Sequence, residues 1–317
     1  MTVSEPAWDP LGIRVPLPLS ATVFPLGYRL EIQTNQQSVV EAAVESWPGG
    51  DLDHGRPALK LTAIVAPASS DRLLTRAAQY RAHGDTLVAA VDADNLVISR
   101  LSTGEMTLWG QTDLVGNTQT FRKSLLEGVV YQTLCHLYLT PIHAACVSLN
   151  GRGVLLCGPP GSGKSSLAYS CAKAGFTFVS DDVTYLIRDE APYALGRCHW
   201  IRMKPGAQQL FGLNGAESTD EEGVAELRAD TELGFSCTPK CIASSIVFLD
   251  QTPDSHSPVT VSPADALARL MVDLPADIPD VSTRQVSSMR QIAGNGAYLI
   301  SREPVETQVE EVRKILG

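Results

Sequence analysis

The sequence predicts an α/β protein built from two domains, and its length, composition and residue pattern each support this class. A chain of 317 residues is longer than one ordinary hydrophobic core supports. Its 44% hydrophobic residues are enough to build two cores, and its 19% charged residues are fewer than a disordered chain carries. Segments that alternate apolar and polar residues are interspersed with segments of helical periodicity, which indicates mixed α/β structure.

The overall charge and the cysteines exclude several classes of protein. The net charge of −10 argues against a protein whose whole surface binds nucleic acid or anionic lipid. No apolar run reaches the ~18 residues of a membrane span, and the N-terminus lacks a basic and then apolar signal segment. We therefore expect a cytoplasmic protein with neither a nucleic-acid nor a membrane partner. The seven cysteines are scattered, which favours reduced thiols over a disulfide or zinc framework.

The first domain, expected over residues 1–118, reads as a small α/β unit without a chemical motif. An extended, proline-rich lead-in over 1–25 precedes the expected elements. Strands are predicted at 27–33, 58–65, 86–92, 95–99 and 105–110, and helices at 36–47 and 70–83. Asn35 is the predicted cap of the first helix, and Ser70 or Asp71 caps the second.

The second domain, expected over residues 119–317, begins with apolar positions that suit one long helix over 121–139, ended by Pro141. A strand at 142–149, a turn at 150–153 and a strand at 154–157 follow. Asn150-Gly151 between two apolar runs is a strong hairpin signal. The next motif therefore lies at the tip of a buried strand.

That motif is a phosphate-binding loop. The segment 158–165 matches G-x-x-x-x-G-K-[ST] at every fixed position, between an apolar strand and a helix that Gly175 ends. Glycines allow backbone N–H groups to surround phosphates, and the helix N-terminus adds a positive dipole. Lys164 supplies charge to the β- and γ-phosphates, and the Ser165 hydroxyl can bind Mg²⁺. We expect ATP to contact the residues of the loop and the start of the helix: Gly158, Pro159, Pro160, Gly161, Ser162, Gly163, Lys164, Ser165 and Ser166.

Two apolar strands end in aspartate, and a P-loop enzyme needs one such carboxylate to hold magnesium. The strand over 176–180 comes directly after the P-loop helix and delivers Asp181 and Asp182 together. Neighbouring strand residues point in opposite directions, so one carboxylate could accept a proton while the other binds the metal. Asp250, at the end of the strand over 246–249, is followed by turn residues and is interpreted as structural.

With these motifs, the chain over residues 120–250 resembles the HPr serine kinase/phosphorylase family. The family combines a G-x-x-G-x-G-K-S loop with a strand ending in Asp-Asp, and a histidine opens the strand of its preceding hairpin, where His143 stands. The resemblance implies a P-loop kinase domain of the HPr-kinase type, a mixed sheet with flanking helices, after a smaller α/β domain. It also implies Asp181 as general base, Asp182 as metal ligand and His143 near the transferring phosphate.

Two departures make the chain more similar to divergent HPr-kinase-related proteins, some of which phosphorylate serine on other polypeptides. The glutamate-bearing, glycine-rich segment that engages HPr is absent, and Ser166 stands where the bifunctional enzymes typically have glutamate. The resemblance implies ATP, Mg²⁺ and a protein or peptide carrying the acceptor serine. The family forms hexamers, so a homo-oligomer is an open expectation.

Further charged residues have no assigned role from the sequence. The alternating run of Arg197, His199, Arg202 and Lys204 suits either a phosphate-facing surface or a protected strand edge. The acidic segment 217–232 suits a solvated loop, and the segment 304–316 suits an amphipathic helix that packs on the domain. Arg284 and Arg290 are late candidates for a phosphate contact.

The leading hypothesis is an ATP-dependent kinase that phosphorylates a hydroxyl, with a serine of a polypeptide ahead of a small molecule. A P-loop ATPase or regulatory ATP-binding module without an acceptor is the alternative. A GTPase is disfavoured because no Asn-Lys-x-Asp motif occurs. An enzyme like phosphoenolpyruvate carboxykinase would need a His/Lys/Asp metal set that the sequence does not show.

Overall fold

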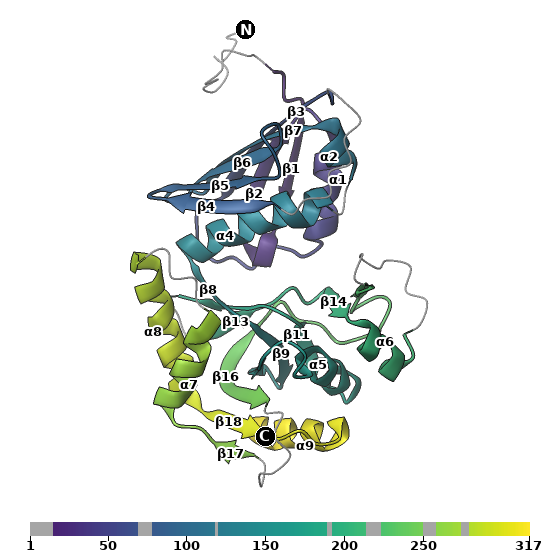
Figure 1. Ribbon diagram of the computed structural model, residues 1–317, viewed down its shortest axis with the longest axis vertical. Coiled ribbons are helices and arrows are strands. Elements are labelled where there is room, and N and C mark those ends of the chain that lie inside the picture. The colour runs from purple at the N-terminus through teal and green to yellow at the C-terminus, as the bar shows by residue number, and fades with distance from the viewer. Residues whose placement is uncertain are drawn as a thin grey trace. The chain divides into compact units, whose positions relative to one another are not determined.

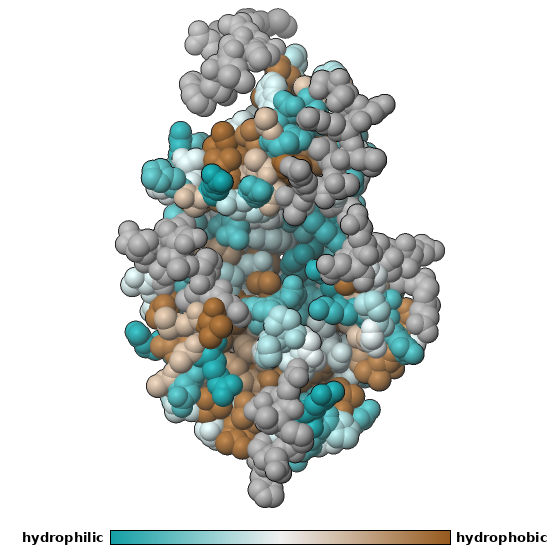
Figure 2. Space-filling view, viewed as in Figure 1, coloured by the Kyte–Doolittle hydropathy of each residue, from teal (hydrophilic) through white to brown (hydrophobic). Residues whose placement is uncertain are grey.

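The computed structural model describes residues 15–68, 78–117, 120–188, 192–213, 223–249, 258–273 and 279–317. The chain separates into two compact units, Met1–Leu137 and Tyr138–Gly317, and both are mixed α/β structures (Figure 1). Across the described part of the chain, no helix combines the length and apolar character needed to span a bilayer. Hydrophobic and hydrophilic residues are interspersed on the face that Figure 2 shows. All seven cysteines are free thiols.

The first unit is built on a seven-stranded mixed sheet in the order β1-β2-β3-β7-β6-β5-β4. The pairs β2–β3 and β3–β7 are parallel and the other pairs are antiparallel. Its elements are β1 (Leu19–Val23), η1 (Pro25–Gly27), β2 (Leu30–Thr34), α1 (Gln37–Ser46), β3 (Leu59–Ala66), β4 (Gln79–His83), β5 (Thr86–Ala90), β6 (Leu96–Arg100), β7 (Glu105–Gln111), α2 (Thr112–Gly116), the π-helical η2 (Phe121–Glu127) and α4 (Gly128–Leu137).

Several expectations for this unit need correction. The predicted helix over 70–83 is wrong at its end, because Gln79–His83 forms edge strand β4, while 70–77 lie outside the described residues. Asn35 does not cap α1; its side chain exchanges two hydrogen bonds with the backbone of Val65, at 2.8 and 2.9 Å. The lead-in contains strand β1, and residues 1–14 lie outside the described part.

The division between the units also differs from the expected one after residue 118. It falls between Leu137 and Tyr138, so η2 and α4 belong to the first unit. The reason is packing: the buried Thr133 of α4 bonds Ser99 of β6 and contacts the sulfur of Met106 in β7. The predicted long helix is present but ends at Leu137, and Pro141 lies within the following strand.

The second unit is built on a nine-stranded mixed sheet. Seven strands run in the order β11-β9-β10-β16-β13-β12-β8, and β18 pairs with β16 and with β17. Strands β14 and β15 form a separate antiparallel pair. The elements are β8 (Leu139–Ile142), β9 (Ala144–Leu149), β10 (Arg152–Cys157), α5 (Lys164–Lys173), β11 (Thr177–Ser180), β12 (Thr184–Ile187), β13 (Tyr193–Leu195), β14 (Trp200–Met203), α6 (Pro205–Phe211), β15 (Ala225–Arg228), β16 (Lys240–Leu249), β17 (Val259–Thr260), α7 (Pro263–Leu270), η3 (Met271–Asp273), α8 (Pro279–Asn295), β18 (Ala297–Ile300) and α9 (Val305–Leu316).

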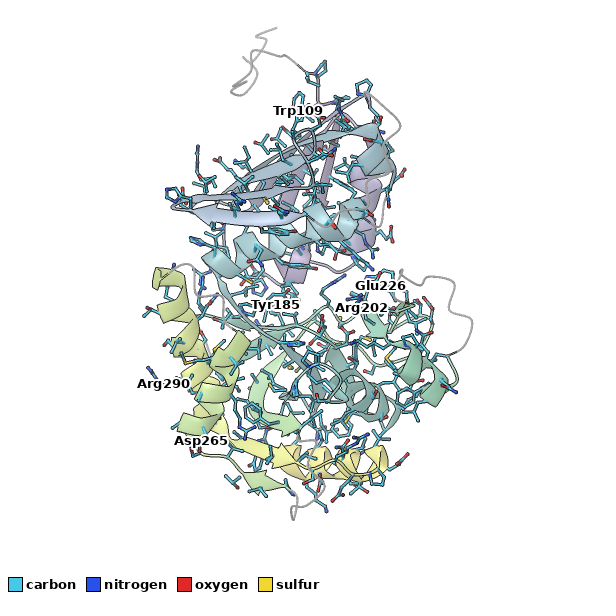
Figure 3. The ribbon with its side chains drawn as sticks, viewed as in Figure 1. Trp109, Tyr185, Arg202, Glu226, Asp265 and Arg290 are labelled. Atoms are coloured by element: carbon cyan, nitrogen blue, oxygen red, sulfur yellow. The ribbon has the colours of Figure 1, made fainter. Side chains whose placement is uncertain are left out.

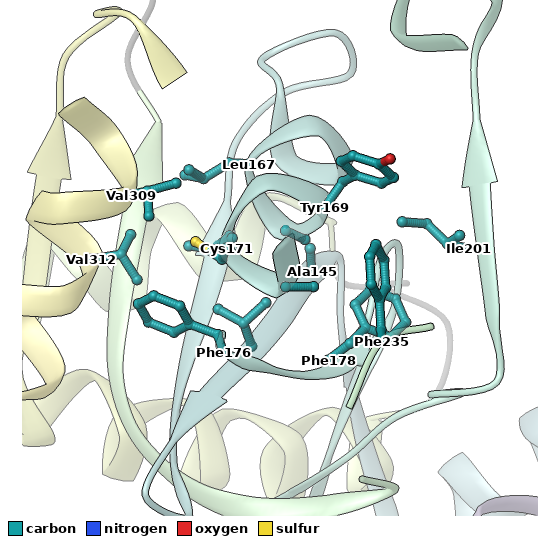
Figure 4. Packing of buried hydrophobic residues seen from close by; sticks show 14 of the residues in the cluster. Ala145, Leu167, Tyr169, Cys171, Phe176, Phe178, Ile201, Phe235, Val309 and Val312 are labelled. Carbon is teal, nitrogen blue, oxygen red and sulfur yellow. The ribbon is translucent and has the colours of Figure 1, made fainter. Parts of the chain in front are cut away.

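Alternate residues of β9, β10 and β16 enter two different cores, one on each face of this sheet. One core joins the sheet to α5, α9 and β14–β15 through Leu167, Tyr169, Phe176, Ile201 and Val312 (Figure 4). The other joins it to α7 and α8 through residues such as Leu270 and Ile292. The predicted amphipathic terminal helix therefore packs within the second unit, and its partner there is the helix that follows the P-loop. The central strand β10 is fixed from both sides where it leads into the loop.

The predicted hairpin before the loop is confirmed. Asn150 and Gly151 both have positive φ, of 52° and 78°, which is the backbone of a type I′ turn. Strand β9 then pairs with β10 in the register Leu149↔Arg152 through Ala144↔Cys157. Since Cys157 ends the strand, residue 158 begins the loop at the edge of the sheet.

Candidate active site

The loop between β10 and α5 leads directly into the N-terminus of a helix. Gly163 precedes the first residue of α5 in the left-handed conformation, and the helix begins at Lys164. The first N–H groups of an α-helix have no partner within the helix and can donate to an anion. At Gly158 a Cβ atom would lie 2.6 Å from Ser162 Oγ, so a side chain there would disrupt the loop.

Lys164 is buried and its amine lies within the loop. Nζ donates to the carbonyl oxygen of Gly158 at 2.7 Å and lies 3.4 Å from that of Pro159. The positive charge of Lys164 therefore lies inside the loop, next to the backbone of its first two residues. A phosphate bound there would provide oxygen atoms for the same amine to contact.

The doubled aspartate lies beside the P-loop serine. Strand β11 ends at Ser180, and Ser165 Oγ donates to the carbonyl oxygen of Asp181 at 3.4 Å. This contact joins the start of α5 to the end of β11. It brings together the two sequence motifs that are separated by sixteen residues.

Asp181 is buried, with 8% of its surface exposed, and its carboxylate is held by backbone. Oδ2 accepts a hydrogen bond of 2.6 Å from the backbone N–H of Arg202 in β14. Burial, with a smaller contribution from the neighbouring Asp182, raises the pKa of Asp181 to about 6, although the Arg202 N–H and the charge of Arg197 act in the opposite direction. A carboxylate with this pKa accepts a proton more readily than an exposed aspartate.

Asp182 points differently and contacts the predicted histidine. Its side chain is 54% exposed, and Oδ1 lies 3.4 Å from Nε2 of His143. His143 occupies the break between β8 and β9 and is 32% exposed. The structure therefore brings His143, the Asp pair and the P-loop serine to one edge of the second unit's sheet.

Two of the alternating residues after the Asp pair, His199 and Arg202, have different neighbours. Arg202 is exposed on β14 opposite Glu226 of β15, and Figure 3 shows the two side by side. His199 and Arg228 instead bind Asp230, with His199 Nδ1 at 2.9 Å and Arg228 Nη2 at 3.0 Å. These hydrogen bonds lower the pKa of Asp230, with the Arg228 bond the larger cause.

Two features of the site have no signal in the sequence. One is the Arg202 N–H that holds Asp181. The other is Gly196, where a Cβ atom would lie 2.1 Å from the carbonyl oxygen of Val179 in β11. The absent side chain allows the segment that carries Arg197 to lie against the strand that ends in the Asp pair.

The remaining candidates lie elsewhere. Arg290 is exposed on α8, and Figure 3 shows it on the other side of the second unit from Arg202. Arg284 is exposed on the same helix. Asp250 and the acidic residues at 217–222 lie outside the described residues.

No family model and no curated protein matches the chain. Among solved structures, it is similar to the Hpr(Ser) kinase/phosphatase from Coxiella burnetii, with 15% sequence identity over 55% of this chain and 94% of that one. The TM-score is 0.31. A likeness of this degree does not transfer an activity, so the function of this chain has to be inferred from its own residues.

Proposed function

We propose that this chain is an ATP-dependent kinase that transfers the γ-phosphate to a hydroxyl, the acceptor being a serine of a protein or peptide. One observation supports this above the others. The P-loop serine lies against a strand end that presents two different carboxylates, the buried Asp181 with a pKa of about 6 and the exposed Asp182 beside His143.

In this proposal the loop binds the triphosphate of ATP. The backbone from Gly158 to Gly163 surrounds the phosphates, and the first turn of α5, including Ser165 and Ser166, donates N–H groups. The Lys164 amine, which now contacts the carbonyl oxygens of Gly158 and Pro159, neutralises charge on the β- and γ-phosphates.

The donor set fits Mg²⁺, which prefers hard oxygen ligands. The Ser165 hydroxyl and the Asp182 carboxylate would hold the ion, and both belong to the segments that the 3.4 Å contact between Ser165 and Asp181 joins. When bound, Mg²⁺ would supply positive charge that stabilises the phosphates of ATP. Exposure of Asp182 leaves its carboxylate accessible to such an ion.

Asp181 acts as the general base. The acceptor hydroxyl oxygen attacks the γ-phosphorus, and its proton passes to the Asp181 carboxylate. The new P–O bond forms as the bond to the oxygen that bridges the β- and γ-phosphates breaks, so the products are a phosphoester and ADP. The Arg202 N–H keeps one oxygen of Asp181 fixed, so the carboxylate does not need to reorient.

His143 and the exposure of the site support a large acceptor. His143 contacts Asp182 and would lie near the transferring phosphate, where it limits rotation of that carboxylate. Both side chains are partly exposed to solvent, at 32% and 54%, so the acceptor side of the site is open to a polypeptide. A fully enclosed pocket would instead have favoured a small molecule.

The experiment separates binding from transfer in two variants. Lys164→Ala should abolish ATP binding, measured by titration calorimetry. Asp181→Asn should bind ATP as the wild type does, while transfer of labelled γ-phosphate to a polypeptide pool falls at least ~100-fold. An Asp181→Asn variant that transfers phosphate at the wild-type rate would contradict the proposed base. Wild-type release of inorganic phosphate without a labelled acceptor would favour an ATPase.

A further inference from the structure

The sheet of the first unit has two unequal faces. One face is covered by α1, α2 and α4, which Figure 1 shows along one side of the sheet. The side chains on that face are buried, and they include Leu61, Ala63, Leu87, Val97 and Leu108. Among the described residues of β2 to β7, every side chain that points to the opposite face is partly or fully exposed.

One row of side chains across that exposed face is apolar. The strand register places Ala90, Leu96, Trp109 and Ile64 in one row across β5, β6, β7 and β3. In the next row Val88 and Ile98 continue the apolar patch, with Ile98 46% exposed, and Thr107 and Thr62 complete the row. Trp109 is labelled in Figure 3. A solvated sheet face is ordinarily polar, and a contiguous apolar patch marks an interaction surface.

A row of charges borders this apolar patch, and its signs alternate. The register aligns Arg100, Glu105, Lys60 and Glu31 across β6, β7, β3 and β2. The order is positive, negative, positive, negative. If the row is reversed, each position carries the opposite charge to the one that it had before. A second copy of the row, laid over the first in the reverse direction, therefore places a negative charge opposite each positive one.

We propose that two copies of this chain dimerise by stacking these exposed sheet faces about a two-fold axis parallel to the strands, between β7 and β3. This surface lies in the first unit, and the proposal does not depend on the kinase activity. The axis sets Glu105 opposite the partner's Lys60, and Arg100 opposite the partner's Glu31. It also sets Trp109 opposite the partner's Ile64.

The proposed contact has the ordinary features of a symmetric interface. A two-fold axis uses the same patch on both copies, so each complementary pair occurs twice. Stacked sheets lie about 10 Å apart, a distance that long charged side chains and tryptophan can fill from both sides. Arg100 and Glu105 are 3.3 Å apart within one chain but 59% and 52% exposed, which leaves them accessible to a partner. Glu31 contacts Arg29 at 3.1 Å and is likewise 42% exposed.

Charge reversal tests the proposal through pairing between chains. In sedimentation velocity of the full chain, Lys60→Glu and Glu105→Lys should each raise the dimer dissociation constant at least about tenfold, since each creates two like-charge contacts. Mixing the two variants should restore the dimer, because the glutamate introduced at position 60 of one chain then faces the lysine introduced at position 105 of the other. Arg81→Glu is the matched control: Arg81 is exposed on the same face, but its strand β4 lies outside the overlap.

Each other outcome overturns the proposal. If the wild-type chain stays monomeric at every concentration tested, the exposed sheet face does not bind a second copy of the chain. If neither charge reversal weakens the dimer, the dimer forms through a different surface. If both reversals weaken it and mixing the two variants does not restore it, the substitutions act within one chain and not between chains. Rescue also shows that both variants are folded. If one of them does not fold, Arg100→Glu mixed with Glu31→Arg makes the same test on the outer pair.

Discussion

Replacing Asp181 by asparagine should stabilise the protein while it removes activity. The carboxylate is ionised at neutral pH although it is 8% exposed, and burial raises its pKa from the ordinary 3.8 to about 6. At about 1.4 kcal/mol per pKa unit, this difference corresponds to a destabilisation of about 3 kcal/mol at pH 7.5. Asparagine carries no charge, and its side-chain oxygen still accepts the Arg202 N–H.

The sign of the pH dependence follows from the raised pKa. The Asp181 carboxylate binds its proton more tightly in the folded state than in the unfolded state. The destabilisation by its charge is therefore present above pH 6 and disappears as the pH falls to 3.8. In urea unfolding at pH 7.5, Asp181→Asn should raise the free energy of unfolding by about 1–3 kcal/mol. At pH 4.5 the gain should be much smaller.

A matched control and a clear refutation are available. Asp182→Asn, at a side chain that is 54% exposed, should change the free energy of unfolding by less than about 0.5 kcal/mol. The reasoning fails if Asp181→Asn destabilises the protein at pH 7.5. It also fails if the gain is the same at both pH values, because the ionised carboxylate would then not be its source.

Four further results are expected. The rate of phosphate transfer should rise with pH through an apparent pKa near 6 as Asp181 loses its proton, and a flat profile from pH 5 to 7.5 would contradict the assignment. Arg122→Ala removes the buried ion pair of 3.3 Å between Arg122 and Glu127 and should cost about 3–5 kcal/mol of stability in thermal unfolding, whereas exchange of both residues for apolar ones should cost nearly none. Gly196→Ala should cost about 1–3 kcal/mol because its Cβ meets the Val179 carbonyl oxygen; Gly206→Ala, where the space is open, is the control and should not destabilise. Asp230→Asn should lower the free energy of unfolding by about 2 kcal/mol at pH 7. Because the pKa of Asp230 is lowered in the folded state, the wild type should lose the stability that this carboxylate contributes only in strong acid. If the wild type already loses that stability near neutral pH, another group is its source.

The parts of the fold that are predictable from sequence depend on short stretches of chain. The hairpin at Asn150-Gly151 and the strand, loop and helix around residues 158–165 are specified by local residue types, and both form where the sequence predicts them. Strands β3, β5, β6 and β7 follow the alternation of apolar residues within one or two positions. In each case the local preference and the tertiary packing agree.

The incorrect predictions arise where distant contacts decide the structure. Residues 79–83 contain good helix formers, yet they form an edge strand because they pair with β5, and all five are exposed, so no apolar pattern marks them. Asn35 has the type and position of a helix cap, but it bonds the backbone thirty residues away. The helix over 121–137 is predictable, while the unit it packs against is not.

The candidate site shows the same division. Motif spacing alone places the P-loop and the Asp pair, and the structure brings them to one sheet edge together with His143. The hydrogen bond from Arg202 to Asp181, and the close approach of Gly196 to Val179, join segments that only the folded chain brings together. No pattern of residue types marks a backbone N–H that binds a side chain twenty-one residues away.

The most direct test of the proposed kinase activity is to identify the molecule that receives the γ-phosphate of ATP. The purified chain is incubated with ATP labelled at the γ-phosphate and with the polypeptides encoded beside its gene, and the labelled products are separated and hydrolysed to amino acids. The proposed function predicts labelled phosphoserine in a polypeptide with the wild type, and none with Lys164→Ala or Asp181→Asn. Label found only in inorganic phosphate, at equal rates with the wild type and Asp181→Asn, would contradict it.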